Sequence, residues 1–395
     1  MKLVGLLTSA VVVYALVAAC VLWPGGALSS NAGGDEAHAQ LPGNPGNFPG
    51  SSIPDSRRKL PVAQRGHVSL EGLPYRGVTM QLQRPDWMDK YKKSLDEIAS
   101  LGADTVKLVV DARQENGSAA RIYLDLRMTP SAEALTDLIK YARSKNLRVI
   151  LMPIVLLDKP VGNEWRGQIS PDDHNGGWHM WWESYREMLM HYAYIAEGTG
   201  VDVLVIGSEL VSTQTNIEEW TKTINKVREI YKGRLTYSAN WDNYTAVPFW
   251  DQLDMIGMNS YWKMSDNEGD KATIDDMKAE WKEIQKDLLP WLKKQGKPLL
   301  FLEIGWFSQE NAAVTPWDYT QPVDLKPIDL QIQKRLYEAF FQSWYGQPLM
   351  GGFNIWEWTP GDGGPEDSGY TPEGKPAEKV LREWLAKGPW QVKLN

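Results

Sequence analysis

From about His67 onward, runs of apolar residues alternate with longer segments in which apolar residues recur at helical spacing. The runs are apolar at consecutive positions, as in Val-Ile-Leu-Met-Pro-Ile-Val-Leu-Leu at 149–157, which is typical of strands buried on both faces. The pattern predicts eight strands, at 76–82, 105–111, 148–157, 201–210, 235–240, 255–262, 299–306 and 352–358. Helices are predicted between them, for example at 131–144, 217–231, 274–294 and 330–345.

Eight strand-then-helix units predict a single (β/α)8 barrel. A doubly wound sheet usually has a glycine-rich phosphate turn after its first strand, and none follows Leu82. The connections from strand to helix are long, at 111–130, 158–178, 307–327 and 359–375, whereas those from helix to strand are short. Since barrel enzymes build their clefts from long loops at the carboxyl ends of the strands, we expect the functional residues there.

A targeting segment precedes the barrel. An apolar run at 3–23 is about as long as a bilayer core requires, and a stretch rich in Gly, Pro, Ser and Asn follows it. We therefore divide the chain into a signal peptide or anchor at 1–23, a flexible linker at 24–66 and the barrel at 67–395.

Three fates of the first segment remain open. It can stay as a membrane anchor, be cleaved after the Ala-His-Ala at 37–39, or carry a lipid on Cys20, where the preceding Val17-Ala18-Ala19 resembles a bacterial lipobox. In each of these cases the barrel is exported from the cytoplasm. We therefore expect an extracytoplasmic protein, secreted or anchored to the bacterial cell envelope, that meets the membrane only through this segment.

The amino-acid composition limits the kinds of partner and cofactor that we expect for this protein. The net charge is −8, with 42 Lys and Arg against 50 Asp and Glu, so nucleic acid is not an expected partner. A single cysteine excludes an internal disulfide and a four-thiolate zinc site, and the histidines at 174, 179 and 191 form no metal-binding motif, so we expect neither a metal nor another cofactor. The 19 Trp and 16 Tyr against 7 Phe fit either a large aromatic core or rings that stack on sugars.

Acidic residues stand at several predicted strand ends, at positions 111, 158, 209, 242, 303 and 357. Glu209 and Glu303 each interrupt a run that is otherwise apolar, and a buried carboxylate is costly unless it is paired or used. One such residue alone is more often a structural ion pair. Strands four and seven lie across the barrel mouth, however, so the two glutamates are able to approach to about 5 Å, the separation used by retaining glycosidases. No Gly-x-Ser-x-Gly motif supports a serine hydrolase.

Five short motifs together resemble glycoside hydrolase family 113. They are Gly-Ser-Glu-Leu at 207–210, Ala-Asn-Trp-Asp at 239–242, Gly-Met-Asn-Ser-Tyr-Trp at 257–262, Leu-Glu-Ile-Gly-Trp at 302–306 and Trp-Glu-Trp at 356–358. They occur in the order and on the strands that the family requires, and the resemblance covers nearly all of 67–395. It implies a (β/α)8 retaining glycosidase with catalytic glutamates on strands four and seven, and mainly endo-β-mannanase activity.

The resemblance also implies roles for individual residues. Glu209 corresponds to the general acid/base and Glu303 to the nucleophile. Tyr261 matches the tyrosine that hydrogen-bonds the nucleophile, and Trp356 or Trp358 matches the aromatic floor under the cleaved sugar. The chain departs from the wider clan just before the acid/base, where Ser208 replaces the usual Asn that binds the sugar 2-hydroxyl. This departure leaves the preference for manno or gluco substrates open.

Further candidates for substrate binding come from position alone. Side chains at or just beyond strand ends point into a barrel cleft or into the upper layer of the core, and these are Trp241, Asp242, Asn259, Tyr261, Trp306, Trp356 and Trp358. Lys107 lies inside strand two, where a buried ammonium needs a carboxylate partner, either in the cleft or in a core ion pair. His179 begins the helix after an aromatic loop and is a candidate for the wall of a sugar-binding groove.

The sequence therefore predicts a monomeric retaining β-glycoside hydrolase that acts on β-mannan or a related β-linked hexose polysaccharide, most simply as an endo-β-1,4-mannanase. Two alternatives stay open, a non-catalytic carbohydrate-binding barrel and a transglycosylase. Two facing carboxylates argue against a pure binding protein, because binding does not require them. Hydrolysis and transglycosylation use the same residues, and the sequence does not separate them, nor endo from exo action.

Overall fold

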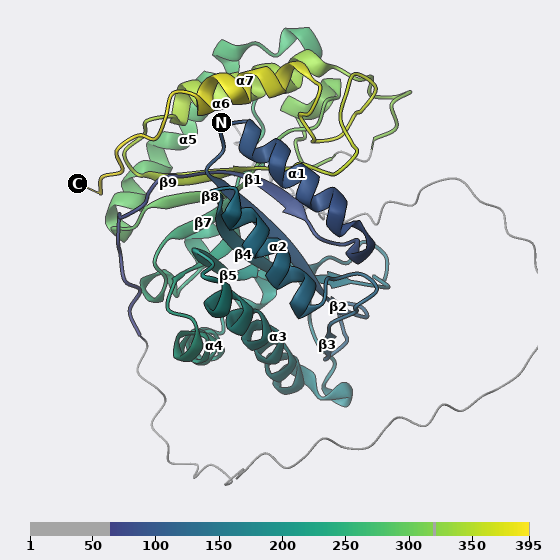
Figure 1. Cartoon of the computed structure of the whole chain (residues 1–395), viewed down its shortest axis with the longest axis vertical. Coiled ribbons are helices and arrows are strands. Elements are labelled where there is room, and N and C mark those ends of the chain that lie inside the picture. Colours follow the sequence, from purple (N-terminus) through teal and green to yellow (C-terminus); the bar gives the residue numbers. More distant parts are fainter. Residues whose placement is uncertain (1–63, 319–320, 395) are drawn as a thin grey trace, which may run out of the picture.

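The computed structural model describes residues 64–318 and 321–394. Eight parallel strands close into a barrel, in which β1 (Tyr75–Gln81) pairs with β2 (Thr105–Gln114) and with β9 (Met350–Ile355) (Figure 1). The other barrel strands are β4 (Arg148–Leu157), β5 (Val203–Ser208), β6 (Arg234–Asn240), β7 (Ile256–Asn259) and β8 (Leu299–Ile304). This arrangement confirms the predicted (β/α)8 fold. The predicted targeting segment 1–23 and nearly all of the linker 24–66 lie outside the described residues.

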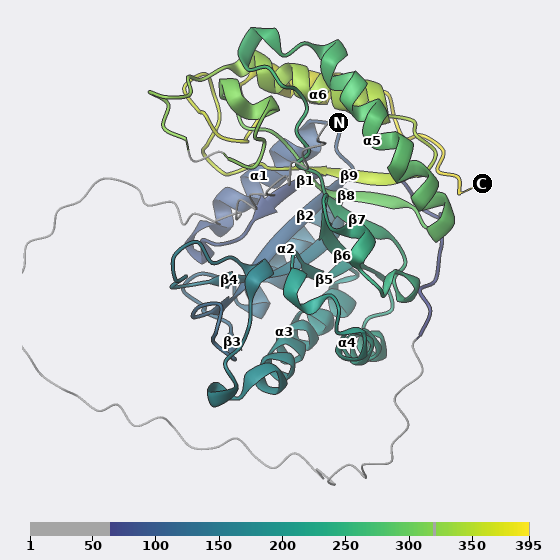
Figure 2. The ribbon, with the colours of Figure 1, turned by 180° about the vertical axis from the view of Figure 1, so that it is seen from behind.

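Seven helices of the described chain surround the barrel. They are α1 (Met88–Ser100), α2 (Ala132–Ser144), α3 (Gly177–Thr199), α4 (Ile217–Ile230), α5 (Ile274–Gln295), α6 (Leu330–Trp344) and α7 (Pro376–Leu385). Figure 1 shows α1, α2 and α3 side by side along one flank, and Figure 2 shows α5 and α6 together on the other side of the sheet from α3 and α4. Among these helices, none combines the length and the apolar character needed to cross a bilayer.

The strand-and-helix alternation breaks once, between β6 and β7. Only two short 3-10 turns, Tyr244–Ala246 and Trp250–Gln252, occupy this connection, so the expectation of eight complete strand-helix units is wrong here. Phe249 and Trp250 are almost completely buried, and the Phe249 ring stacks on Trp220 of α4 at 4.9 Å between centroids. These bulky aromatic side chains cover the barrel where a helix would otherwise pack.

The strands separate two hydrophobic layers. In β5, Val203 and Val205 belong to the core inside the barrel, whereas Leu204 and Ile206 belong to the larger core between the strands and the helices. Both faces of the strand are therefore buried, which explains why its sequence is apolar at consecutive positions.

A short hairpin extends the barrel beside its carboxyl end. The strand β3 (Ile122–Tyr123) pairs antiparallel with the last residues of β2, which runs three residues beyond its predicted end. The long connections that leave β2, β4, β8 and β9 all lie at this end of the barrel, as the sequence predicted.

Candidate active site

Glu209 follows the last residue of β5 in a constrained backbone conformation. Its φ is +57°, a left-handed value that costs a residue with a Cβ about 1–3 kcal/mol. The chain on both sides is anchored, since the Glu209 N–H donates to the carbonyl of Ser238 at 2.9 Å and the Leu210 N–H donates to the Tyr237 hydroxyl at 2.9 Å. The side chain is only 2% exposed, so the fold holds a strained, buried carboxylate at the strand end.

Glu303 lies on β8 and is 5% exposed. The Tyr261 hydroxyl donates to its Oε2 at 2.8 Å, and the Lys107 Nζ lies 3.7 Å from its Oε1. Burial raises the pKa of the Glu303 carboxyl, Lys107 opposes the rise, and the nearby charge of Glu209 adds to it. The two glutamates are thus close enough for each charge to act on the other.

The end of β7 holds both carboxylates in place. The Asn259 side-chain amide donates to Glu209 Oε1 at 3.0 Å, and its oxygen accepts a hydrogen bond from Ser238 at 2.6 Å. Tyr261, two residues further along, holds Glu303. Because one short segment binds the two glutamates, their relative position is set by a single rigid element.

Lys107 is completely buried inside the barrel beneath the site. Its ammonium lies 5.1 Å from the centroid of the Trp356 ring. Burial lowers the Lys107 pKa to about 8, against the opposing charges of Glu303, Glu357 and Glu209. At neutral pH this residue therefore supplies most of a positive charge to a group of carboxylates.

Trp356 and Glu357 follow β9 and form the next part of the site. Trp356 is partly exposed and packs against the core inside the barrel. Gly305 lets the two strand ends approach, because a Cβ at this position would lie 2.0 Å from the Trp356 carbonyl oxygen. The Gln81 amide donates to Glu357 at 2.9 Å, and burial raises the pKa of the Glu357 carboxyl to about 7.

Three predicted substrate-binding residues border this group. Ser208 is buried next to Glu209, and its hydroxyl, which has almost no exposed surface, has no hydrogen-bond partner among the described residues. Trp241 is partly exposed just beyond β6, and Asp242 beside it is exposed. Trp241 and Asp242 thus border the opening of the barrel, whereas Ser208 is buried beside Glu209.

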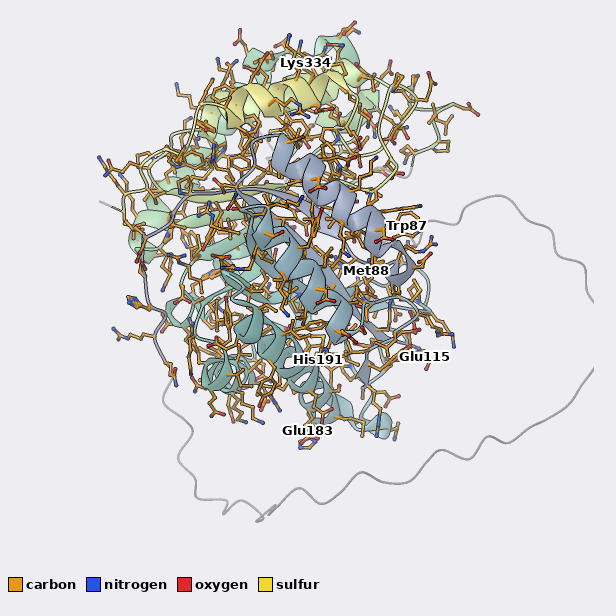
Figure 3. The ribbon with its side chains drawn as sticks, viewed as in Figure 1. Trp87, Met88, Glu115, Glu183, His191 and Lys334 are labelled. Carbon is orange, nitrogen blue, oxygen red and sulfur yellow. The ribbon has the colours of Figure 1, made fainter. Side chains whose placement is uncertain are left out.

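The structure does not bring three other candidates to this opening. Trp306 is fully buried, with its ring against Tyr337 of α6 at 5.3 Å. Trp358 is 1% exposed, and its indole N–H donates to Glu97 of α1 at 3.0 Å. His179 lies on the outer face of α3, where its imidazole is 3.6 Å from Glu183, which Figure 3 shows at the periphery of the fold.

The comparisons with known proteins agree with this geometry. The model of Glycoside Hydrolase Family 113 matches residues 78–375. The chain belongs to glycoside hydrolase family 113. The match confirms the resemblance inferred from the five motifs, and the protein is a glycoside hydrolase.

Solved structures of this family are similar over the whole barrel. A GH113 β-mannanase from Alicyclobacillus acidocaldarius, in complex with ManMIm, is 28% identical with a TM-score of 0.71, over 80% of this chain and 99% of that one. A second structure, of a GH113 β-1,4-mannanase complex, is 26% identical with a TM-score of 0.71, over 80% of this chain and 100% of that one. A β-glucuronidase from Faecalibacterium prausnitzii, at 14% identity and a TM-score of 0.54 over 83% of this chain and 52% of that one, shares the fold alone. No curated protein matches the chain.

One residue beside the two glutamates escaped the sequence analysis. Arg166, in the connection between β4 and α3, places its guanidinium 3.0 Å from Glu209 Oε2, and its side chain is 15% exposed. The length of this connection was the only signal, because an arginine inside a long loop carries no periodicity that would place it.

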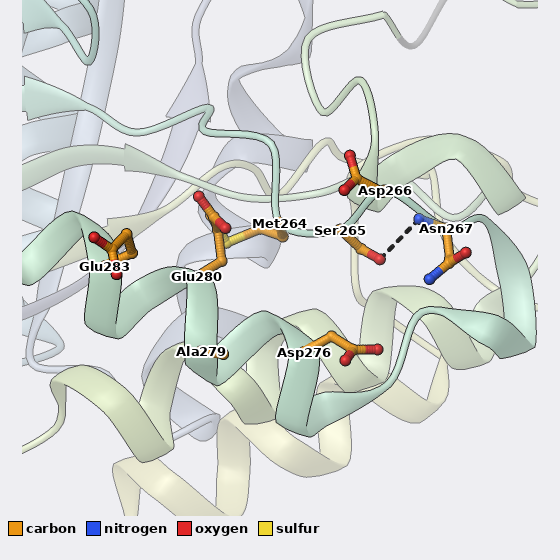
Figure 4. A pocket seen from close by; sticks show the side chains of 8 residues that line it. All are labelled: Met264, Ser265, Asp266, Asn267, Asp276, Ala279, Glu280 and Glu283. Carbon is orange, nitrogen blue, oxygen red and sulfur yellow. Dashed lines mark hydrogen bonds between the residues drawn. The ribbon is translucent and has the colours of Figure 1, made fainter.

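A separate hollow of about 370 Å³ lies beside α5 (Figure 4). It is lined by Met264, Ser265, Asp266, Asn267, Asp276, Ala279, Glu280 and Glu283. None of these residues belongs to the group around Glu209 and Glu303, so the hollow is not part of the active site.

Proposed function

We propose that this family 113 enzyme is a retaining endo-β-1,4-mannanase in which Glu303 is the nucleophile and Glu209 the general acid/base. The observation that carries the proposal is the arrangement of the two carboxylates, which Asn259 and Tyr261 hold from one strand end. The likeness to solved GH113 β-mannanases supports the substrate.

The contacts fit a double displacement. In the first step, the Glu303 carboxylate attacks the anomeric carbon, the glycosidic C–O bond breaks, and the proton of Glu209 passes to the leaving oxygen. In the second step, Glu209 takes a proton from a water molecule, whose oxygen attacks the same carbon and displaces Glu303. Lys107 and Tyr261 favour the ionised form of Glu303 that the first step requires.

A pair of alanine variants tests the two roles. Glu303→Ala should be inactive on β-mannan and on an activated aryl β-mannoside, because no covalent intermediate forms. Glu209→Ala should still attack the activated substrate, whose leaving group needs no proton, and azide should then accelerate release of the sugar. Glu183→Ala, on the exposed face of α3, is the control and should keep full activity.

Product stereochemistry and product size complete the test. Nuclear magnetic resonance of the first product should show the β-anomer, and longer acceptor-derived products would indicate transglycosylation. An α-anomer from the unmodified enzyme, or azide rescue of Glu303→Ala in place of Glu209→Ala, would refute the assignment.

We also propose that the enzyme acts outside the cytoplasm. The apolar run at 3–23 and the polar linker after it support export. Cell fractionation should find the full chain in the envelope or the medium, and a chain that begins at His67 should be soluble and active. Full-length, unprocessed protein in the cytoplasm would contradict export.

A further inference from the structure

Two long connections at the carboxyl end of the barrel are joined by backbone hydrogen bonds. They are the connection between β4 and α3, which carries Arg166, and the connection that follows β2. The Lys159 N–H donates to the Glu115 carbonyl at 2.7 Å, and further along the chain the Ser170 N–H donates to the Gly117 carbonyl at 2.8 Å. Arg166 lies between these two contacts, so its segment is attached to the neighbouring connection on both sides.

Glu164 attaches the stretch between these contacts. Its Oε2 accepts hydrogen bonds from the Gly117 N–H at 3.1 Å, in the neighbouring connection, and from the Val161 N–H at 2.9 Å, in its own. Hydrogen bonds from backbone N–H groups to a carboxylate are stronger than those to a neutral acceptor. Gly117 allows the close approach, because a Cβ at this position would lie 3.0 Å from the Glu164 carboxyl group. One oxygen of a half-buried carboxylate therefore holds the two connections together.

The connection after β2 supports Glu164 firmly. Gln114 is completely buried, and its side-chain amide donates to the carbonyls of Asn116 at 2.8 Å and of Ala119 at 2.9 Å. Gly117 lies within the turn that these two bonds hold. The N–H that binds Glu164 is therefore fixed relative to β2.

Arg166, two residues after Glu164, is accurately placed against the proposed acid/base. Its Nη2 is 3.0 Å and its Nε is 3.2 Å from the same oxygen of Glu209, Oε2. Two hydrogen bonds from a planar guanidinium to one atom weaken when the backbone that carries the arginine shifts. We propose that Glu164 is a positioning residue, which holds Arg166 in place against Glu209.

This inference rests on the proposed function, in which Glu209 protonates the leaving oxygen. As the proton leaves, Glu209 acquires a negative charge, and the Arg166 guanidinium is placed to stabilise that charge in the transition state. An activated aryl β-mannoside needs no proton on its leaving group, so its cleavage depends less on Arg166. Loss of Glu164 should therefore affect the cleavage of β-mannan more than that of the aryl substrate.

Glu164→Ala tests the inference through the ratio of kcat/KM for β-mannan to that for the aryl β-mannoside. The variant loses both N–H bonds, and we expect the ratio to fall about fivefold, because Arg166 is then less often in place. Glu164→Gln keeps an oxygen that accepts both bonds and should keep the ratio close to the wild-type value. Gly117→Ala, whose methyl group would press on the Glu164 carboxyl, should lower the same ratio and provides the test where Glu164→Ala does not fold.

A double variant shows whether Glu164 acts through Arg166. When Arg166→Met is already present, Glu164→Ala should lower the ratio no further, because the group that Glu164 positions is gone. Effects that multiply in the double variant would overturn the inference. An unchanged ratio in the folded single variants, or an equal fall on both substrates, would overturn it as well.

The control is Glu115→Ala, which changes an exposed residue near the edge of the fold (Figure 3). It removes the ion pair with Lys159 at 3.2 Å, which joins the same two connections, and should leave the ratio unchanged because exposed pairs contribute little. A fall in the ratio as large as that of Glu164→Ala would contradict the specific role of Glu164. A wild-type enzyme that cleaves neither substrate would instead overturn the proposed function.

Discussion

Buried charges at the two ends of the barrel are arranged in different ways. At the amino-terminal end, Asp104 lies between Arg76, whose Nε is 2.7 Å from its Oδ2, and Arg148. Asp254 is similarly bound by Arg228 at 2.5 Å and by the backbone N–H of Leu235 at 2.6 Å. Each of these two carboxylates has its own cation or backbone donors, so neither needs a ligand to complete its hydrogen bonds.

At the carboxyl end, three carboxylates lie around one buried ammonium, and only one of the three, Glu209, also pairs with the guanidinium of Arg166. Lys107 faces Glu303, Glu357 and Glu209, and burial outweighs these charges in lowering its pKa to about 8. Burial raises the pKa of Glu303 and of Glu357, whereas the Arg148 guanidinium and the hydrogen bonds from Thr105 and Arg76 outweigh burial and lower the pKa of Asp104. The contrast teaches that matched pairs suit a structural role, whereas carboxyl groups with raised pKa values gather where the catalytic groups are proposed.

The largest effect is expected for Lys107→Met. Loss of the ammonium removes the charge nearest the proposed nucleophile, so kcat/KM on β-mannan should fall by about 10²–10³-fold. Because the variant leaves the buried Glu303 carboxyl without its cation, the free energy of unfolding should also fall, so activity is compared only after circular dichroism shows that the variant is folded. The matched control is Lys297→Met at the opposite end, where the ammonium donates to the Leu253 carbonyl. If Lys297→Met stayed folded and lost as much activity as Lys107→Met, the two ends of the barrel would not differ in the way described.

Asp104→Asn should lower stability and spare activity. It leaves Arg76 and Arg148 without their counter-charge, and the free energy of unfolding should fall by about 2 kcal/mol, less than for full burial because the Asp104 side chain is 27% exposed. The pKa of Asp104 is lowered, so its contribution is present above the unfolded pKa of about 3.9 and is lost as the pH falls through the folded value. Urea unfolding at pH 7 and pH 3 should therefore show a smaller difference between wild type and variant at pH 3. A variant that keeps its stability but loses kcat would contradict the structural role.

Arg166→Met should reduce activity about tenfold on β-mannan, because Glu209 loses one partner while Asn259 still holds the other oxygen. The effect on an activated aryl β-mannoside should be smaller, since its leaving group needs no proton. Arg186→Met, which removes an ion pair with Glu219 on the outer helices at 2.6 Å, is the control and should not change this ratio. Equal losses on both substrates would place Arg166 outside the protonation step.

The smallest effect concerns Glu357→Gln. The folded pKa of Glu357 is raised to about 7. The protonated carboxyl therefore contributes its full stability below the unfolded pKa of about 4.3, and this contribution is lost as the pH rises through 7. The amide variant avoids this loss and should be more stable than the wild type by about 1 kcal/mol at pH 8, with little difference at pH 4. Denaturation of the wild type and of the variant at both pH values measures this difference in stability. Greater stability of the wild type at pH 8 would show that this carboxylate is matched like those at the other end.

The barrel was predictable because buried strands leave an unmistakable pattern. Runs such as those of β4 and β5 place apolar residues on both faces, and the helices between most strands have one apolar face. The connection between β6 and β7 was not predictable in the same way, since Phe249 and Trp250 replace a helix by packing that depends on α4. The sequence also did not show which way the side chains at the strand ends point. Trp356 and Trp358 are two residues apart, yet the first borders Lys107 and the second reaches α1.

The sequence by itself determined the fold class and the family, and it pointed to the two glutamates of the proposed mechanism, because periodicity and short motifs are local properties of the chain. Only the tertiary structure decided which groups act on those glutamates. Arg166 comes from a loop, Lys107 from a strand elsewhere in the barrel, and the stacked rings of Trp241 and Trp317 from two separate connections. Electrostatic and stacking interactions depend on distance in space, and residues far apart along the chain become neighbours only when the barrel closes.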